Sequence, residues 1–157
     1  MIIIDSREKN YKHITDYFGV HSVPFLVEKL ETGDYFNTDN PSVLVDRKAN
    51  LDEICGNLIK GKSRHARFAR ECQRAFKDKI RFVVLIEGTT YTNIDEVKTW
   101  KSYFSKCDGR WLVNEMFRLT MAYGVEWKFC RKNETPQKIL EILGYDERGN
   151  KEKCINA

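Results

Sequence analysis

The sequence has no apolar run long enough to cross a membrane. Its longest runs, such as residues 1–4 and 82–86, contain four or five apolar residues, whereas a transmembrane helix needs about 20. The first residues also lack the basic region followed by a long apolar segment that is typical of an export signal. We therefore expect an intracellular protein that is neither secreted nor bound to a membrane.

The cysteines and histidines lack the spacing of common disulfide and metal sites. The five cysteines are scattered without a CxxC pair, and the three histidines show no ligand spacing. This pattern indicates neither a disulfide framework nor a zinc site, and it favours a reducing compartment. No Ser-His-Asp or Cys-His set for nucleophilic catalysis is evident. Gly61 and Gly88 are too isolated to predict a phosphate-binding loop.

The length and composition fit one folded domain. The chain has 157 residues, of which 41% are hydrophobic and 32% are charged, a balance typical of a globular protein. We predict one domain over residues 1–145 and a polar C-terminal tail over residues 146–157. The net charge of +4 is modest, but residues 60–81 contain nine Lys or Arg and only two acids. Positive charge is therefore concentrated in one segment.

Hydrophobic periodicity and turn signals predict alternating strands and helices. Asn50 and Asp108 are candidate N-caps, and Gly19, Gly61 and Gly124 are candidate helix stops. Two β-rich runs, residues 24–36 and 42–48, are joined by a cluster of turn formers and predict a hairpin. The expected strands are residues 1–5, 24–36, 42–48, 81–88 and 125–130, and the expected helices are residues 11–18, 51–59, 63–79, 109–123 and 135–143. This order predicts an α/β fold, with a central mixed β-sheet flanked by α-helices.

The helix expected at residues 63–79 has one apolar and one basic face. A helical wheel places Phe68, Ala69, Cys72, Ala75 and Phe76 together. The opposite face is basic, and it is either a solvated helix surface or a phosphate-binding surface. The candidate DNA-binding residues are Lys60, Lys62, Arg64, Arg67, Arg70 and Arg74.

Four acidic residues follow or end the predicted strands near the N-terminus: Asp5, Glu8, Asp34 and Asp46. If the first strand and the hairpin are neighbours in one sheet, these carboxylates converge on one edge. Gathered carboxylates repel one another unless a cation lies among them, and oxygen ligands suit Mg²⁺ or Mn²⁺. Each acid also has a simpler interpretation, because Asp34 follows Gly33 as in a turn and Asp5 could end a strand or cap a helix.

Asp46 and Lys48 are two residues apart, so on a strand their side chains point to the same face and Arg47 points to the other. A carboxylate that holds a metal ion, with an ammonium beside it, is suited to phosphodiester hydrolysis. An isolated Asp-x-Lys is more often a surface ion pair. The order of all four acids on predicted strands is what favours a metal site.

The motifs DSRE at residues 5–8, GDY at 33–35 and DRKANLD at 46–52 occur in this order, followed by LIKGKSRHARF and VVLIEG. Together they resemble the nuclease domain of the XPF, Mus81 and Hef structure-specific endonucleases, a branch of the PD-(D/E)xK restriction-endonuclease-like fold. The likeness spans about residues 2–143. It implies a restriction-endonuclease-like α/β fold and a Mg²⁺- or Mn²⁺-dependent nuclease.

The resemblance also implies roles for individual residues. The implied catalytic residues are Asp5, Glu8, Asp34, Asp46 and Lys48. The implied metal ligands are Asp5, Asp34 and Asp46, of which Asp34 and Asp46 would bind the ion directly. The implied supporting residues are Arg7, Arg47, Asp52 and Arg67. One departure is aspartate at position 46, where this branch usually has glutamate, although the wider fold accepts either acid.

These observations predict a metal-dependent endonuclease that cleaves branched DNA, at a fork, flap or junction, in repair, recombination or replication. Family members usually carry a helix-hairpin-helix domain that grips DNA, and the residues after Leu143 are too few to form one. We therefore expect a homodimer, or pairing with another DNA-binding subunit. Two alternatives stay open: a non-catalytic DNA- or protein-binding module that keeps the fold, and a four-way junction resolvase.

Overall fold

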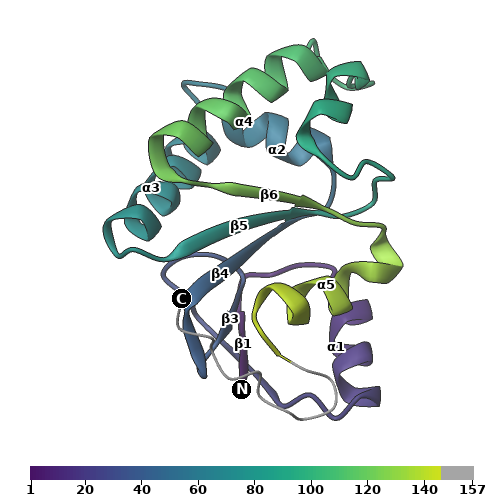
Figure 1. Ribbon diagram of the computed structural model, residues 1–157. Helices are drawn as coiled ribbons and strands as arrows, with labels where there is room; N and C mark the ends of the chain where they lie inside the picture. The colour runs from purple at the N-terminus through teal and green to yellow at the C-terminus, as the bar shows by residue number, and fades with distance from the viewer. Residues whose placement is uncertain (146–157) are drawn as a thin grey trace.

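The computed structural model describes residues 1–145, and the tail predicted at residues 146–157 lies outside them. Its centre is a six-stranded mixed sheet in the order β2-β1-β3-β4-β5-β6 (Figure 1). The strands are β1 Ile2–Asp5, β2 Phe25–Glu28, β3 Tyr35–Asn37, β4 Asn40–Lys48, β5 Arg81–Ile86 and β6 Glu126–Phe129. The β1–β3 and β3–β4 pairs are antiparallel, whereas β1–β2, β4–β5 and β5–β6 are parallel.

Helices cover both faces of the sheet and divide the core into two clusters (Figure 1). On one face lie α2 Leu51–Leu58, α3 Ser63–Lys77, the 3-10 helix η1 Ile94–Thr99 and α4 Gly109–Tyr123. On the other face lie α1 Lys12–Val20 and α5 Thr135–Ile142, with the 3-10 helix η2 Lys132–Glu134 immediately before α5. The predicted sheet flanked by helices is therefore confirmed. No helix among residues 1–145 is both long and apolar enough to span a membrane.

Local sequence signals explain where several helices begin and end. The Asn50 side chain accepts a hydrogen bond from the Glu53 backbone N–H (2.9 Å), which caps α2. Asp108 does the same for the Trp111 N–H (3.0 Å) at the start of α4. Gly124 ends α4 with φ of 67°, a left-handed conformation in which a Cβ is unfavourable. These caps were expected from the sequence and are confirmed.

Three sequence predictions need correction. Helix α1 continues through Gly19 to Val20, because the left-handed residue that turns the chain is Ser22, with φ of 54°. The run at residues 24–36 is divided into β2 and β3, since β2 pairs parallel to β1 at the sheet edge and only β3 forms the hairpin with β4. Phe76 is 58% exposed. It lies at the rim between α3 and α4, where its ring packs edge-on against Tyr123.

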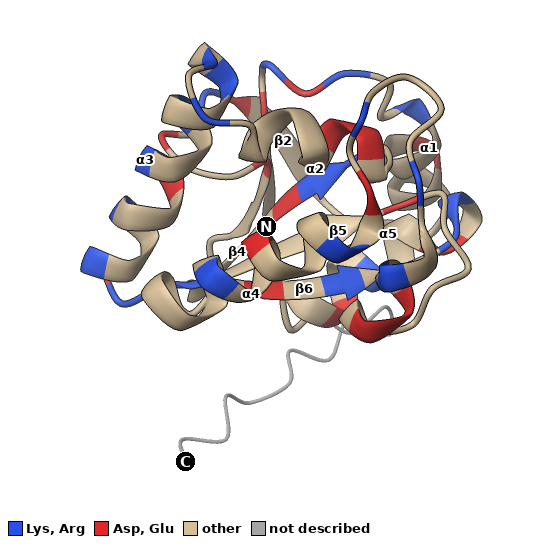
Figure 2. Cartoon of the chain, turned by 90° about the horizontal axis from the view of Figure 1, so that it is seen from above, with Lys and Arg blue, Asp and Glu red and all other residues tan. Residues whose placement is uncertain are grey.

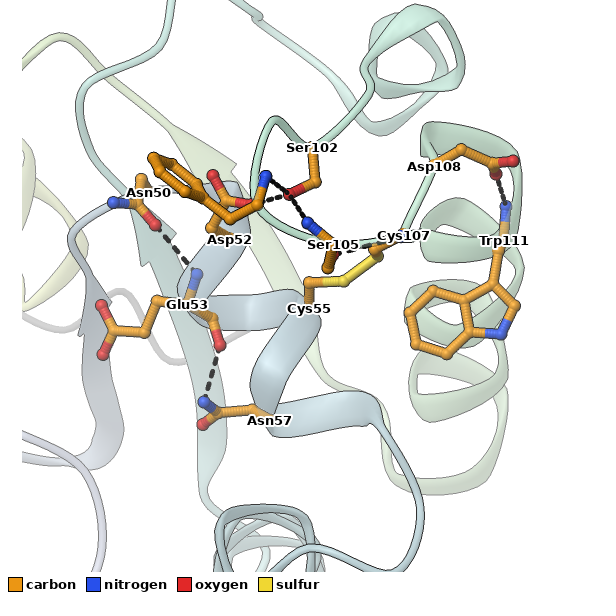
Figure 3. The surroundings of a disulfide bond; sticks show 11 residues. Asn50, Asp52, Glu53, Cys55, Asn57, Ser102, Ser105, Cys107, Asp108 and Trp111 are labelled. Carbon is orange, nitrogen blue, oxygen red and sulfur yellow. Dashed lines mark hydrogen bonds between the residues drawn. A yellow bond between two sulfur atoms is a disulfide. The ribbon is translucent and has the colours of Figure 1, made fainter.

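The expectation that no disulfide forms is also wrong. Cys55 in α2 and Cys107 in the loop before α4 are bonded to each other (Figure 3). They are separated by 52 residues, so spacing along the sequence gave no sign of the pair. Their proximity depends on the packing of α2 beside the segment that joins η1 to α4. Cys72 and Cys130 are free and buried.

Candidate active site

Three aspartates lie side by side at one level of three adjacent strands. Ile4 pairs with Tyr35, and Tyr35 pairs with Val45. One residue further along are Asp5, Asp34 and Asp46. The Asp5 N–H donates to the Asp34 carbonyl (2.8 Å), and the Asp34 N–H donates to the Val45 carbonyl (2.8 Å). The sheet register therefore brings these three residues together from β1, the turn before β3 and the end of β4.

Asp46 and Lys48 form a buried ion pair on the α3 side of β4. The Lys48 Nζ lies 2.8 Å from Asp46 Oδ2, and the two side chains are 9% and 4% exposed. The ammonium also lies 5.1 Å from the centre of the Phe68 ring in α3, within range of a cation–π interaction. Among residues 1–145, no group other than Lys48 contacts Asp46 Oδ2 as a partner. The remaining capacity of this buried oxygen is open to a cation.

Burial and mutual repulsion both affect the carboxyl groups at this site. Burial raises the pKa of Asp34 well above its usual value, and repulsion from Asp46 and Glu8 raises it further. Burial opposes the charged form of Lys48, but attraction to Asp46 and Asp34 outweighs it, so the pKa of Lys48 is also raised. Lys48 is therefore held as an ammonium. One such cation does not neutralise the neighbouring carboxylates.

The residues present fit a divalent cation in part. Asp34 and Asp46 supply carboxylate oxygens, the ligand type of Mg²⁺ and Mn²⁺, and Asp46 Oδ2 has no competing hydrogen bond within the described chain. Residues 1–145 contain no group of three His, Cys, Asp or Glu side chains already placed to hold a metal ion. Asp5 instead accepts hydrogen bonds from Arg7 Nε (2.9 Å) and the Leu30 N–H (3.0 Å). Water and substrate would complete the coordination.

Glu71 in α3 is a site residue that the sequence analysis missed. Burial raises the pKa of its carboxyl group, and Asp46 raises it further, whereas the Gly33 backbone N–H and Lys48 lower it. Glu71 is therefore a further acid close to the Asp46–Lys48 pair. The only signal in the sequence is an acid within a basic segment. Glu71 can be assigned to the site only when the packing of α3 over this part of the sheet is known.

Glu8 and Arg47 lie on the opposite face of β4 from Asp46. The Arg47 guanidinium donates to Glu8 through Nε (2.7 Å) and Nη2 (3.0 Å), and to Glu87 through Nη1 (2.5 Å). Glu8 also accepts a hydrogen bond from the Tyr35 hydroxyl (2.7 Å). The structure therefore pairs Glu8 with Arg47 instead of placing it among the aspartates. Its charge still acts on Asp34 through the sheet.

Glu87, His13 and Thr135 extend this buried network and were not anticipated from the sequence. Glu87 follows β5, and its carboxylate lies 3.0 Å from His13 Nε2. The Thr135 hydroxyl donates to the same carboxylate oxygen (2.6 Å). His13 belongs to α1 and Thr135 to α5, so the network joins two helices to the end of the sheet that carries the candidate site. It links β4, through Arg47, and the residue after β5 to α1 and α5.

Arg7 and Asp52, predicted as supporting residues, bind the chain next to the site. Arg7 contacts Asp5, and its Nη2 donates to the Leu30 carbonyl (2.6 Å). Asp52, in the first turn of α2, accepts a hydrogen bond from the Ser102 hydroxyl (Figure 3). Both residues fix neighbouring segments, and neither joins the carboxylate group of Asp34 and Asp46.

The basic residues predicted to bind DNA lie in α3 and in the turn before it, and Lys and Arg positions recur along this helix (Figure 2). All six are exposed: Lys60, Lys62, Arg64, Arg67, Arg70 and Arg74. Arg74 is already engaged, because it donates to the Thr32 hydroxyl (3.1 Å) and the Glu31 carbonyl (2.6 Å). It ties α3 to the loop before Asp34, so it is less available to a ligand than the other five.

Comparisons with known proteins identify the family and the fold of the chain. A family model described as the ERCC4 domain matches residues 4–143. XPF from Aeropyrum pernix superposes with a TM-score of 0.67 at 20% sequence identity, covering 90% of this chain and 62% of that chain. XPF from Aeropyrum pernix in complex with DNA gives a TM-score of 0.63 at 18% identity, with the same coverage of 90% and 62%. No curated protein matches the chain. The predicted restriction-endonuclease-like fold is confirmed, and the chain spans less than two thirds of the XPF chains it matches.

Proposed function

The chain belongs to the ERCC4-domain family, and from this premise we propose that it is a metal-dependent endonuclease that hydrolyses DNA at branched structures such as forks, flaps or junctions. The Asp46–Lys48 pair carries the proposal, because a buried carboxylate lies 2.8 Å from a buried ammonium at the end of a central strand. Apart from this ion pair, the described residues give Asp46 Oδ2 no partner. Asp34 adds a second carboxylate whose charged form is unfavourable without a further cation.

Each residue has a chemical task in phosphodiester hydrolysis. Asp34 and Asp46 would hold Mg²⁺ or Mn²⁺. Such an ion neutralises phosphate charge and lowers the pKa of a bound water. Lys48 stays protonated beside the aspartates, so it can donate hydrogen bonds to a phosphate oxygen or orient the attacking water. The Phe68 ring and the ion pair with Asp46 restrict where that ammonium can lie.

The family and the molecular surface support the choice of DNA as substrate. One structural relative is described as a complex with DNA, and the six candidate DNA-binding residues along α3 and the preceding turn of this chain are exposed. We place the protein inside the cell, where its DNA lies, in repair, recombination or replication. Mg²⁺ is the proposed cofactor, with Mn²⁺ as its substitute.

We further propose that the chain acts as a homodimer or together with another DNA-binding subunit. It spans 62% of the XPF chains it resembles. Helices α3 and α4 also expose neighbouring apolar side chains, including Phe76 at 58%, Phe117 at 57% and Met121 at 73%. Light scattering of the purified protein with and without DNA measures the assembly.

One observation favours a second candidate, a non-catalytic module that binds DNA or a protein partner. Residues 1–145 hold no group of three side chains arranged as metal ligands. A module of this kind would bind branched DNA without cutting it. It would also show no binding of Mn²⁺ that depends on Asp34, which titration calorimetry detects.

The experiment is a cleavage assay on fork, flap and four-way junction DNA with Mg²⁺ or Mn²⁺. We expect Asp46→Asn and Lys48→Met to reduce cutting by about 100-fold or more, the loss typical of removing one group that stabilises transition-state charge. Asp16→Asn and Lys12→Met are matched controls, because Lys12 and Asp16 form an exposed ion pair on α1. Wild-type failure on all three DNAs, or full activity of Asp46→Asn, would rule out the proposed enzyme.

A further inference from the structure

The loop between η1 and α4 displays two adjacent aromatic rings to solvent. Tyr103 is 99% exposed and Phe104 is 88% exposed, the highest values among the exposed large hydrophobic residues. Exposed apolar side chains that stand alone are normal on protein surfaces, whereas contiguous ones mark interaction sites. We call residues 101–107 the aromatic loop.

Hydrogen bonds within the aromatic loop fix its backbone. The Ser102 hydroxyl accepts from the N–H groups of Phe104 (3.0 Å) and Ser105 (3.1 Å), and the Ser105 hydroxyl accepts from the Cys107 N–H (3.2 Å). The Ser102 N–H donates to the Cys107 carbonyl (3.1 Å), which closes the loop at its base. The two rings are thus presented by a restrained turn. A restrained loop loses less entropy when its side chains bind a ligand.

Two cross-links attach the aromatic loop to α2. The Ser102 hydroxyl donates to the Asp52 carboxylate, and Cys107 is bonded to Cys55 (Figure 3). Helix α2 follows β4 directly, and Asp52 comes four residues after Lys48. The α2 core residues lie on the same face of the sheet as Phe68, against which Lys48 packs. The loop is therefore anchored at the end of β4 that carries the candidate active site.

The sequence in and around the aromatic loop is mostly basic. From Lys98 to Arg110 the sequence contains four basic residues and one acid, Asp108, and that acid caps α4. Lys101 and Lys106 flank the two rings and are exposed. Aromatic rings between cations are suited to single-stranded nucleic acid, because rings stack on bases while ammonium groups attract the backbone. A surface for an apolar protein partner does not require the lysines.

We propose that the aromatic loop binds unpaired nucleotides of the DNA, with Tyr103 and Phe104 stacking on exposed bases beside the scissile strand. This inference deepens the proposed function, because it depends on the chain binding branched DNA. Such DNA presents unpaired or easily unstacked bases at the branch, whereas a continuous duplex does not. The loop thus gives the chain a means of recognising the branch independently of the basic residues of α3, which would contact backbone phosphates.

The test measures equilibrium binding by fluorescence anisotropy. EDTA in the buffer prevents cutting. The probes are a fork with single-stranded arms, a continuous duplex of equal length, and the same fork with 2-aminopurine at the branch. We expect the double variant Tyr103→Ala, Phe104→Ala to bind the fork at least about tenfold more weakly, since one base–aromatic stack contributes about that factor or more. The duplex affinity should change less than about twofold. Wild-type protein should quench the fluorescence of 2-aminopurine by stacking on it, and the double variant should not.

Three further variants make the result specific. Tyr103→Trp and Phe104→Trp keep a ring and should retain fork binding, whereas Val20→Ala, at an exposed apolar residue of α1, should leave it unchanged. Equal loss of affinity for fork and duplex, or no loss, overturns the inference. A change in molar mass by light scattering without a change in fork affinity overturns it in favour of a protein contact. A wild-type protein that binds the fork through Tyr103 and Phe104 but cuts nothing refutes the nuclease function and keeps the inference.

Discussion

At the scale of single residues, Asp34 is the position where stability and proposed function oppose each other. Its pKa is raised by burial and by Asp46 and Glu8. An acid whose pKa is higher in the folded than in the unfolded state stabilises the fold only below the unfolded pKa, and this contribution is lost as pH rises through the folded pKa. At neutral pH, which lies above the unfolded pKa of an aspartate, Asp34 therefore destabilises the metal-free protein. A bound cation would remove that penalty.

The variant Asp34→Asn tests this relation. In EDTA at pH 7.5 we expect its melting temperature to exceed that of wild type by a few degrees, because about 1 kcal/mol shifts the Tm of a domain this size by ~2–4 °C. The difference should shrink as the pH falls through the raised pKa of Asp34 toward the usual aspartate range. Adding Mg²⁺ should raise the Tm of wild type and leave Asp34→Asn unchanged. An exposed control, Asp16→Asn, should show neither effect.

The result can also contradict the interpretation of this site. If Asp34→Asn melts below wild type at pH 7.5, the hydrogen bond from the Arg47 N–H to Asp34 Oδ2 (2.8 Å) outweighs the cost of the buried charge. If Mg²⁺ stabilises both proteins equally, the ion binds elsewhere. Differential scanning fluorimetry over a series of pH values measures all of these quantities.

At the scale of elements, helix α3 carries arginines of two kinds. Some are available to DNA, and one stabilises the fold. Arg67 and Arg70 are exposed, whereas Arg74 binds the loop at Glu31 and Thr32. We expect Arg67→Gln and Arg70→Gln each to weaken binding to fork and duplex alike. Each should also reduce the slope of log K against log salt by about 0.9, the value for one phosphate contact with duplex DNA.

Arg74→Gln is the matched comparison on the same helix. It should leave the salt slope nearly unchanged and lower the Tm slightly, because it removes two hydrogen bonds between α3 and the loop before Asp34. Titrations at several salt concentrations separate the two behaviours. Equal slopes for all three variants and wild type would mean that this face of α3 does not contact DNA.

Elements with strong local signals could be predicted from the sequence. Helix α4 was expected at residues 109–123 and spans Gly109–Tyr123, because a capping aspartate and a terminal glycine mark its two ends. Strand β5 was recognised by its continuous apolar run. The division between β2 and β3 was not foreseen, since their pairing partners are set by β1 and β4 and not by the residues between them.

In the candidate active site, too, contacts within one element could be predicted from the sequence and contacts between elements could not. Asp46 and Lys48 could be paired from strand geometry, because both lie on one element. The separation of Glu8 from the aspartates depends on Arg47 pointing to the opposite face, and the proximity of Glu71 depends on how α3 packs. Contacts between distant elements leave no periodic trace in the sequence. These contacts decide which acids share a site.

At the scale of the whole molecule, the disulfide joins segments that no local signal connects. Cys55 and Cys107 close a span that includes α3, β5 and η1. A bond across a long span restricts the unfolded chain most, and native disulfides typically stabilise by about 2–4 kcal/mol. The same bond anchors the aromatic loop to α2, so stability and the placement of Tyr103 and Phe104 depend on one covalent link.

We expect a reducing agent to lower the Tm by roughly 4–16 °C, from the stabilisation above and a shift of ~2–4 °C per kcal/mol. The double variant Cys55→Ser, Cys107→Ser should melt at the lower temperature with or without the reductant. Cys72→Ala, at a free buried thiol, should keep the difference between the two conditions. Thermal melts with and without reductant, with thiol titration of the native protein, measure the effect. Equal melting of wild type in both conditions, with Cys55 and Cys107 titrating as thiols, would show that packing alone holds the aromatic loop on α2.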